Sequence, residues 1–181
     1  MKNKKLQIGV LGWAGIEEYS IGGPSKNELA IAEKVGFLLA KNGAAVITGG
    51  KGGVMESASR GAKMGNGTTV GVITGPRGTS NKWTDIEIVT GSKIAGFDEV
   101  LIPLMCDAVI VVGGGAGTLQ EICVSYRNNI PIIVISKTFG WAQKIIDEKY
   151  LDSRKTVKIL LAKNAEDAVK KAISHRNLSL L

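Results

Sequence analysis

The stretch Asp107-Ala-Val-Ile-Val-Val-Gly-Gly-Gly-Ala-Gly-Thr-Leu-Gln-Glu121 decides the fold of this chain. Its apolar part, Ala108–Val112, is rich in β-branched residues, which is typical of a strand buried on both faces of a parallel sheet. The glycines that follow predict a tight turn, and the sequence from about Thr118 to Arg127 predicts a helix. A strand, a glycine-rich turn and a helix in this order predict the beginning of a βαβ unit.

The same order recurs along the chain. Further strands are expected at Leu6–Leu11, Ala44–Thr48, Thr68–Ile73, Ile86–Val89, Pro131–Ile135 and Val157–Leu161. Helices are expected from the capping-box pattern Ser25–Glu28 to about Asn42, at Val54–Met64, within Ile94–Met105, at Trp141–Tyr150 and at Ala165–His175. This alternation predicts a three-layer, Rossmann-like α/β fold, with a mostly parallel sheet of about seven strands and helices on both faces. Since no repeat, low-complexity tract or linker interrupts it, residues 1–181 are expected to form a single domain.

Composition excludes several classes of protein. With 44% hydrophobic and 22% charged residues, the chain is expected to be globular, and its 181 residues are enough for a core without disulfides. We interpret Cys106 and Cys123 as core thiols, because each lies in an apolar stretch and the pair lacks CxxC spacing. The single histidine, His175, lies near the C-terminus, so neither a Ser-His-Asp or Cys-His mechanism nor a metal site is expected.

The charge and the N-terminus bear on partners and location. The net charge of +7 comes from lysines spread along the chain, which favours anionic ligands and non-specific contact with nucleic acid. The basic start, Met1–Lys5, is followed by a short apolar run interrupted by glycine, so we expect no signal peptide and no membrane span. The cytoplasm is the expected location.

Three glycine clusters each follow an expected strand, and all three should therefore lie at the same edge of the sheet, where such folds bind ligands. Glycines let a phosphate approach the free amides and the positive end of a helix without a Cβ in the way. The expected phosphate-binding residues are Gly12 and Gly15, then Gly49, Gly50, Gly52 and Gly53, and then Gly113, Gly114, Gly115, Gly117 and Thr118. Tight strand-to-helix turns are the alternative explanation for any one cluster.

Two common nucleotide-binding motifs are absent. No GxxxxGK[ST] occurs, so the chain is not a P-loop NTPase. The first cluster is GxxGxxG-like, and the strand Ala44–Thr48 ends without the acidic residue that would hold a ribose hydroxyl. Both features disfavour NAD binding.

Four side chains beside the clusters are candidates for chemistry or binding. Glu121 is the candidate catalytic residue, and the alternative is that Thr118 and Glu121 form a capping box. Glu56 has a similar place after the second cluster, and Arg60, one turn later, either reaches an anion or pairs with Glu56, which we favour. Trp13 either stacks on a base or packs in the core or as a lid.

These residues resemble the signatures of a known superfamily. Asp107–Glu121 and Thr48–Glu56, with Arg60–Ala62 and residues 65–72, are similar to motifs of the "lonely guy" cytokinin-activating enzymes, a lysine decarboxylase-like group. The resemblance covers roughly residues 6–136. It implies a Rossmann-like fold, dimers or larger assemblies and, in the enzymatic branch, hydrolysis of nucleoside 5′-monophosphates to free base and ribose 5-phosphate. In the branch motif PGGxGTxxE, Glu121 matches the catalytic Glu, and Gly114, Gly115, Gly117 and Thr118 match the phosphate loop.

The chain departs from that branch at two positions. Gly113 replaces the motif proline, and the family's catalytic arginine falls on Asp98 or, with a shift of one residue, on Phe97. No arginine occurs between Gly78 and Tyr126. Since losing a charge-stabilising group commonly costs orders of magnitude in rate, the resemblance to the hydrolase motif does not by itself imply turnover.

The VGGGxGTxxE form is more similar to molybdenum cofactor carrier-like proteins, whose ligand is a phosphorylated pterin. The resemblance therefore implies a homo-oligomeric protein that binds a phosphorylated nucleotide-like or pterin-like small molecule, such as a molybdopterin-type ligand, and requires no other cofactor. The first alternative is a phosphoribohydrolase that uses Glu121. The second is a nucleic acid-binding protein, which the lack of a basic stripe interleaved with aromatic residues disfavours.

Overall fold

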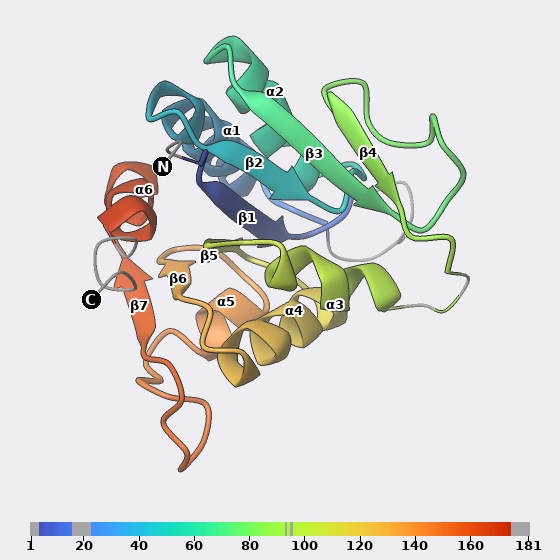
Figure 1. Cartoon of the computed structure of the whole chain (residues 1–181). Helices are drawn as coiled ribbons and strands as arrows, with labels where there is room; N and C mark the ends of the chain where they lie inside the picture. Colours follow the sequence, from blue (N-terminus) through green and yellow to red (C-terminus); the bar gives the residue numbers. More distant parts are fainter. Residues whose placement is uncertain (1–3, 16–22, 93, 95, 175–181) are drawn as a thin grey trace.

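The computed structural model describes residues 4–15, 23–92, 94 and 96–174. The strands among these residues form a seven-stranded sheet (Figure 1). Its strands are β1 (Gln7–Gly12), β2 (Ala45–Thr48), β3 (Thr68–Ile73), β4 (Ile86–Val89), β5 (Ala108–Val112), β6 (Ile132–Ile135) and β7 (Ile159–Ala162). All neighbouring strands are parallel, in the order β4-β3-β2-β1-β5-β6-β7. The strand order reverses between β1 and β5, which makes this the switch point of the sheet.

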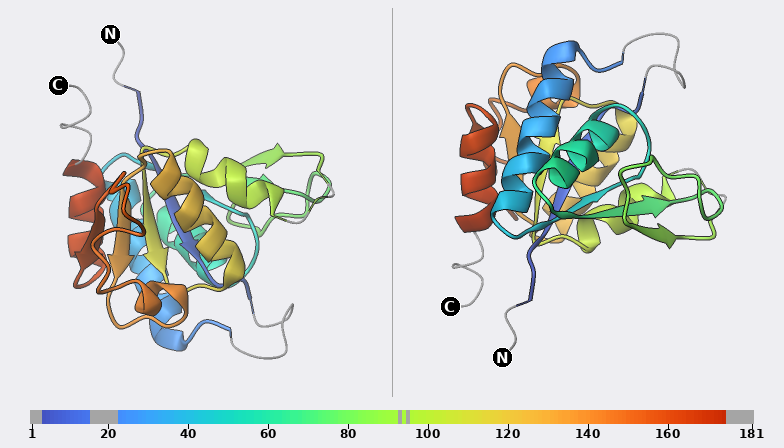
Figure 2. Two further views of the ribbon diagram at one scale, coloured as in Figure 1. Left: turned by 90° about the horizontal axis from the view of Figure 1, so that it is seen from below. Right: turned by 90° about the horizontal axis from the view of Figure 1, so that it is seen from above.

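Helices cover both faces of the sheet, as predicted. One face carries α1 (Lys26–Lys41), α2 (Val54–Met64) and α6 (Ala165–Ser174), and the other carries α3 (Phe97–Leu104), α4 (Ala116–Arg127) and α5 (Trp141–Lys144) (Figure 2). Each layer of helices packs its own apolar core against the sheet. All five residues of β5 are buried, because this strand is central and covered on both sides.

The helix α1 begins as the sequence predicts. Ser25 is its N-cap, and the side chains of Ser25 and Glu28 form the complete capping box. The bounds of α2, β3, β4 and β5 also agree with the predicted ranges. His175, expected to end the last helix, lies outside the described residues.

Two predicted helices have different bounds. The helix α5 ends at Lys144 instead of Tyr150, because the backbone carbonyl of Lys149 accepts a hydrogen bond from the Ile159 amide at the start of β7 (3.0 Å). The helix α4 begins at Ala116, two residues earlier than predicted, because Gly115 adopts the extended conformation of an N-cap.

The prediction that both cysteines are core thiols is wrong for Cys123, which is exposed. Ile122 and Tyr126 on the same helix face the core, so the next residue after Ile122 points away from it. Cys106 is half-buried, and burial raises the pKa of its thiol, as do the carboxyl groups of Glu121 and Asp107. None of the described helices has the length and apolar character needed to cross a bilayer.

The helices α1 and α2 approach each other closely through two glycines. A Cβ on Gly36 would lie 1.9 Å from the Ala58 carbonyl oxygen, and a Cβ on Gly61 would lie 1.9 Å from the Glu33 carbonyl oxygen. The two helix backbones are therefore in direct contact. This contact fixes the start of α2, and with it the glycine turn after β2, beside the end of β1.

Candidate functional site

The turns after β1 and β5 begin side by side at the switch point. Gly12 at the end of β1 is in register with Val112 at the end of β5. A Cβ on Gly12 would lie 2.3 Å from the Val112 carbonyl oxygen, so this glycine is required by the packing of the two strands. In parallel α/β sheets, ligands bind in the crevice that opens at this point.

A cavity of about 340 Å³ occupies this crevice. It is bounded by the turn after β1, by the turn after β2, by the start of α4 and by α3. The residues that line it are Gly12, Trp13, Ala14, Gly15, Gly23, Gly49, Lys51, Met55, Asp98, Glu99, Ile102, Gly115, Ala116, Gly117, Thr118 and Glu121. The structure thus brings part of each predicted glycine cluster to one cavity.

The first turn of α4 forms a wall of free amides. Its N-cap, Gly115, provides no side-chain cap, and the amides of Ala116, Gly117 and Thr118 make no hydrogen bond to any described residue. The first amide to donate is that of Leu119, to the Gly115 carbonyl oxygen (3.0 Å). Free amides at the positive end of a helix are a common binding site for anions.

Three acidic side chains form a second, acidic wall of the cavity. Asp98 and Glu99 come from the start of α3, and Glu121 from the second turn of α4; Asp98 and Glu121 are 4% and 7% exposed. The Lys51 ammonium lies 3.9 Å from the Asp98 carboxylate and is the single basic side chain among the described residues that line the cavity.

Burial and mutual repulsion shift the acids of this wall. Burial and, to a smaller extent, neighbouring Asp98 together raise the pKa of Glu99 to about 7. Burial also raises the pKa of Glu121 well above its usual value, with contributions from Glu99 and Asp98, while Lys51 acts in the opposite direction. Such shifts are common where carboxyl groups are held for binding or for proton transfer.

Glu121 is not part of a capping box. The capping-box alternative required Thr118 as the N-cap, but Gly115 holds that position and Thr118 is the third residue of the helix. The carboxylate of Glu121 is therefore available to the cavity.

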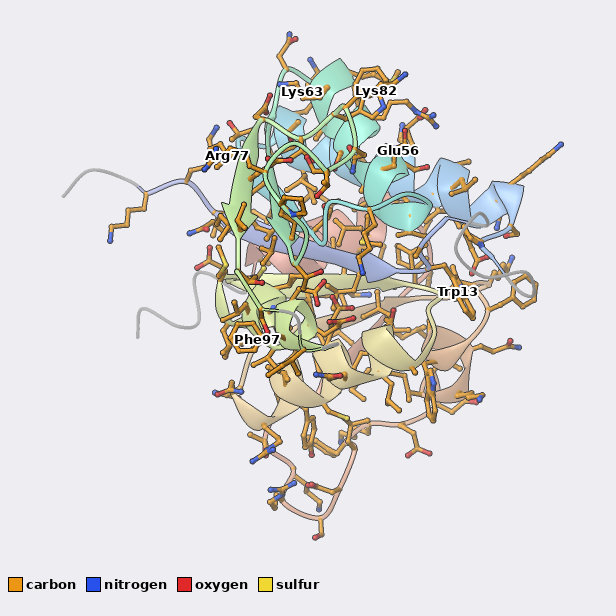
Figure 3. All side chains as sticks on the ribbon, turned by 90° about the vertical axis from the view of Figure 1, so that its right-hand side faces the viewer. Trp13, Glu56, Lys63, Arg77, Lys82 and Phe97 are labelled. Carbon is orange, nitrogen blue, oxygen red and sulfur yellow. The ribbon has the colours of Figure 1, made fainter. Side chains whose placement is uncertain are left out.

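Trp13 packs against the turns instead of standing open to solvent. A Cβ on Gly113, Gly115 or Gly140 would lie about 3 Å from the Trp13 ring, at 2.8, 3.1 and 2.8 Å. The indole Nε1 is buried and has no hydrogen-bond partner among the described residues. These contacts favour packing, the second of the two interpretations of Trp13, although the residue also lines the cavity at the end of β1 (Figure 3).

Gly113 and Gly114 hold the turn after β5 in place. The Gly114 carbonyl oxygen accepts a hydrogen bond from the Trp141 amide at 2.9 Å, and there is no room for a Cβ on Gly113 beside the Glu28 carboxylate and Trp13. Neither residue lines the 340 Å³ cavity. Within the third cluster, Gly115, Gly117 and Thr118 are the predicted residues that do.

The second cluster is divided between two cavities. Gly49 lines the first cavity, whereas Gly50, Gly52, Gly53 and Glu56 line a second cavity of about 550 Å³ together with Thr79, Ser80 and Asn81. Gly15 and Lys51 line both, so the two cavities adjoin at these residues. Glu56 is on α2 (Figure 3), and it lines the second cavity.

Arg60 lines neither cavity. The predicted pair with Glu56 is wrong: the Arg60 guanidinium donates to the carboxylate of Glu33 on α1. Because α1 and α2 are in direct contact at Gly36 and Gly61, Glu33 lies within reach of Arg60, although it is 27 residues away in sequence.

The resemblance gives two positions for the family's arginine, Asp98 and Phe97, and the structure places them differently. Asp98 is buried in the cavity, whereas Phe97 is 38% exposed on α3 (Figure 3). Of the two positions, the one that lines the cavity therefore carries an acid. Glu99 and Lys51 were not predicted as site residues. The acidic start of α3 was the available signal, but Gly96 and Pro103 obscured the bounds of that helix.

Comparison with known proteins places this geometry in a family. The model of the SLOG cluster4 family matches residues 5–169. Among solved structures, TM1055 is 30% identical with a TM-score of 0.84, over 93% of this chain and 99% of its own. The molybdenum cofactor binding protein of Rippkaea orientalis is 28% identical with a TM-score of 0.79, over 96% and 98%. The molybdenum cofactor carrier protein of Chlamydomonas reinhardtii is 27% identical with a TM-score of 0.76, over 94% and 99%. The chain therefore belongs to the SLOG cluster4 family.

Proposed function

We propose that this protein binds a phosphorylated pterin-like or nucleotide-like small molecule in the 340 Å³ cavity. The anionic group of the ligand lies on the free amides of Ala116, Gly117 and Thr118, near the Lys51 ammonium. The observation that carries the proposal is this set of amides, which have no hydrogen-bond partner among the described residues and open into a cavity at the switch point.

The remainder of the cavity suits a planar ring. Trp13, Met55 and Ile102 add apolar surface to the lining of the cavity. Small-molecule sites commonly combine such surface with a few polar groups that fix the orientation of the ligand. The names of the two structural relatives that bind or carry the molybdenum cofactor support a pterin-type ring as the first ligand to test.

The proposal is tested by mass spectrometry of small molecules released from the purified native protein, followed by calorimetric titration with the compound found. We expect a phosphorylated heterocycle to be released. Gly117→Ala should weaken its binding at least about tenfold, because the added Cβ narrows the cavity beside the amides, where it lies 3.0 Å from Glu99 Oε1. Alanine favours the helix, so lost binding cannot be attributed to unfolding. Binding that is unchanged in Gly117→Ala would show that the amides are not the anion site.

A second candidate function is hydrolysis of nucleoside 5′-monophosphates. It is favoured by the buried Glu121 carboxyl, whose raised pKa is typical of a group that transfers protons. Asp98, at one of the two positions that match the family's arginine, argues against it. Incubation with AMP and measurement of free adenine test this function: release that Glu121→Gln abolishes would establish it, and the absence of release would rule it out for this substrate.

A further inference from the structure

We infer that Glu99 and Glu121 recognise the ring of the ligand by accepting hydrogen bonds from two adjacent donors, an amino group beside a ring N–H. The ligand then carries the 2-amino-4-oxopyrimidine edge that guanine and pterins share. This inference rests on the proposed function and adds to it the chemistry of the ring.

The acidic side chains buried in this protein differ in whether their carboxylates have hydrogen-bond partners. Glu28, 1% exposed, accepts hydrogen bonds from the Ser25 amide (2.8 Å), the Ser25 hydroxyl (2.8 Å) and the Phe139 amide (2.9 Å). Glu121, 7% exposed, makes no hydrogen bond or ion pair through its carboxylate with any described residue. The Glu99 Oε2 atom is likewise buried without a partner.

Buried polar groups in folded proteins almost always have hydrogen-bond partners, and an unsatisfied carboxylate is costly. Glu99 and Glu121 both line the cavity, whereas Asp98 has Lys51 beside it. Glu99 and Glu121, which make no salt bridge with a described residue, therefore line the space that a ligand would occupy. In its ionised form a carboxylate only accepts hydrogen bonds. A ligand that presents donors therefore stabilises the ionised forms of Glu99 and Glu121 against the burial and repulsion that raise their pKa.

The surroundings narrow the nature of these donors. Within the described part of the chain, no group of three or more His, Cys, Asp or Glu side chains is arranged to hold a metal ion, which disfavours a divalent cation as the occupant. The neighbouring cavity surface from Trp13, Met55 and Ile102 is apolar and suits a flat ring more than an alkylammonium group. A flat ring whose edge carries N–H donors packs on the apolar surface and donates hydrogen bonds to the carboxylates.

This geometry predicts a preference among otherwise similar bases. Guanine and pterins present an amino group next to a ring N–H. Hypoxanthine presents the ring N–H without the amino group, and adenine presents an amino group next to a ring nitrogen that accepts. A site built to accept hydrogen bonds discriminates against a ring that leaves its carboxylates unpaired or places a lone pair against them.

The test is calorimetric titration of the full chain with GMP, IMP, AMP and neopterin monophosphate. We expect GMP or the phosphorylated pterin to bind at least about tenfold more tightly than IMP and AMP. Whichever of the two binds more tightly identifies the source of the shared edge. In Glu99→Gln and Glu121→Gln, the preference over AMP should fall to within about threefold, because the amide of Gln replaces an acceptor with a donor.

Glu148→Gln is the matched control, since Glu148 is exposed and lines neither cavity, and it should keep the wild-type preference. Equal affinity of the wild-type protein for GMP and AMP, with both lost in Gly117→Ala, would overturn this inference and leave the proposed function intact. A preference that both Gln variants retain would also overturn it. If none of the four compounds binds and no phosphorylated heterocycle is released from the native protein, the proposed function itself is wrong.

Discussion

The glycines at the α1–α2 contact and the glycine at the start of α4 look alike in the sequence but have different roles. At Gly61 an added Cβ would meet a backbone carbonyl oxygen at 1.9 Å, and nothing there can move without separating two helices. At Gly117 the nearest atom, Glu99 Oε1 at 3.0 Å, is the end of a flexible side chain. The first glycine is required for packing, whereas the second leaves amides accessible from the cavity. A cluster of glycines is therefore a sign of function only where the backbone beside it faces open space.

The largest expected effect is at the packing glycine. Gly61→Ala should lower the free energy of unfolding by about 2–3 kcal/mol, since the clash with the Glu33 carbonyl oxygen forces α1 and α2 apart. Chemical denaturation monitored by circular dichroism measures this change. A variant within about 0.5 kcal/mol of the wild type would show that the two helices separate at little cost, and the contrast with Gly117 would be lost.

The acidic wall should give the next largest effect, as a dependence of stability on pH. Burial and Asp98 raise the pKa of Glu99 from 4.5 to about 7 in the folded protein. Its contribution is therefore most favourable below pH 4.5 and is lost as the pH rises to about 7. Relative to Glu99→Gln, the wild type should lose on the order of 1 kcal/mol of stability across this interval, because Glu99 is only half-buried and solvent screens it.

Denaturation midpoints of both proteins, measured between pH 4.5 and 8, check this prediction. The exposed-site variant Glu148→Gln should follow the wild type throughout. Parallel pH profiles for the wild type and Glu99→Gln would contradict the prediction.

A smaller effect of opposite sign is expected at the site glycine. Gly117→Ala should raise the free energy of unfolding by about 0.4–1 kcal/mol, because alanine reduces the conformational freedom of the unfolded chain and Gly117 has an ordinary helical conformation. Thermal melting of this variant beside Gly61→Ala sharpens the comparison directly. If Gly117→Ala is destabilised as strongly as Gly61→Ala, the two glycines have the same role after all.

The smallest effect is expected for the ion pair that spans the same helix contact. Arg60→Met should change the free energy of unfolding by less than about 1 kcal/mol, since the side chains of Arg60 and Glu33 are both partly exposed to solvent. It should leave ligand affinity unchanged, because Arg60 lines neither cavity. Titration of this variant with the compound released from the native protein measures the ligand affinity. Weakened binding would show that Arg60 contributes to the binding site.

The sequence was sufficient to predict most of the fold, because local signals and packing agree there. The β-branched run of β5 and the capping box at Ser25 each specify one structure, and the bounds of both elements were predicted closely. Where the prediction was wrong, a distant contact overrides the local pattern. The continuation of α5 toward Tyr150 is such a case, since Lys149 pairs with Ile159 instead.

The candidate site was predictable in part, for the same reason. The three glycine turns lie at the same edge of the sheet because the strands before them are parallel. The structure places part of each turn at one cavity. The approach of Glu99 to Gly117 and of Lys51 to Asp98 depends on how α3 packs, which no local pattern in the sequence specifies. The partner of Arg60 was missed because it lies on another helix.

One residue links most of these turns. The carbonyl oxygen of Trp13 accepts a hydrogen bond from the Val54 amide at the start of α2 (2.9 Å). The indole ring of Trp13 packs on Gly113, Gly115 and Gly140. The described residues that Trp13 contacts after β2, β5 and β6 are thus held against the end of β1 before anything enters the crevice. Their ordering entropy is lost during folding and not at association, so a small molecule needs few contacts to be retained here.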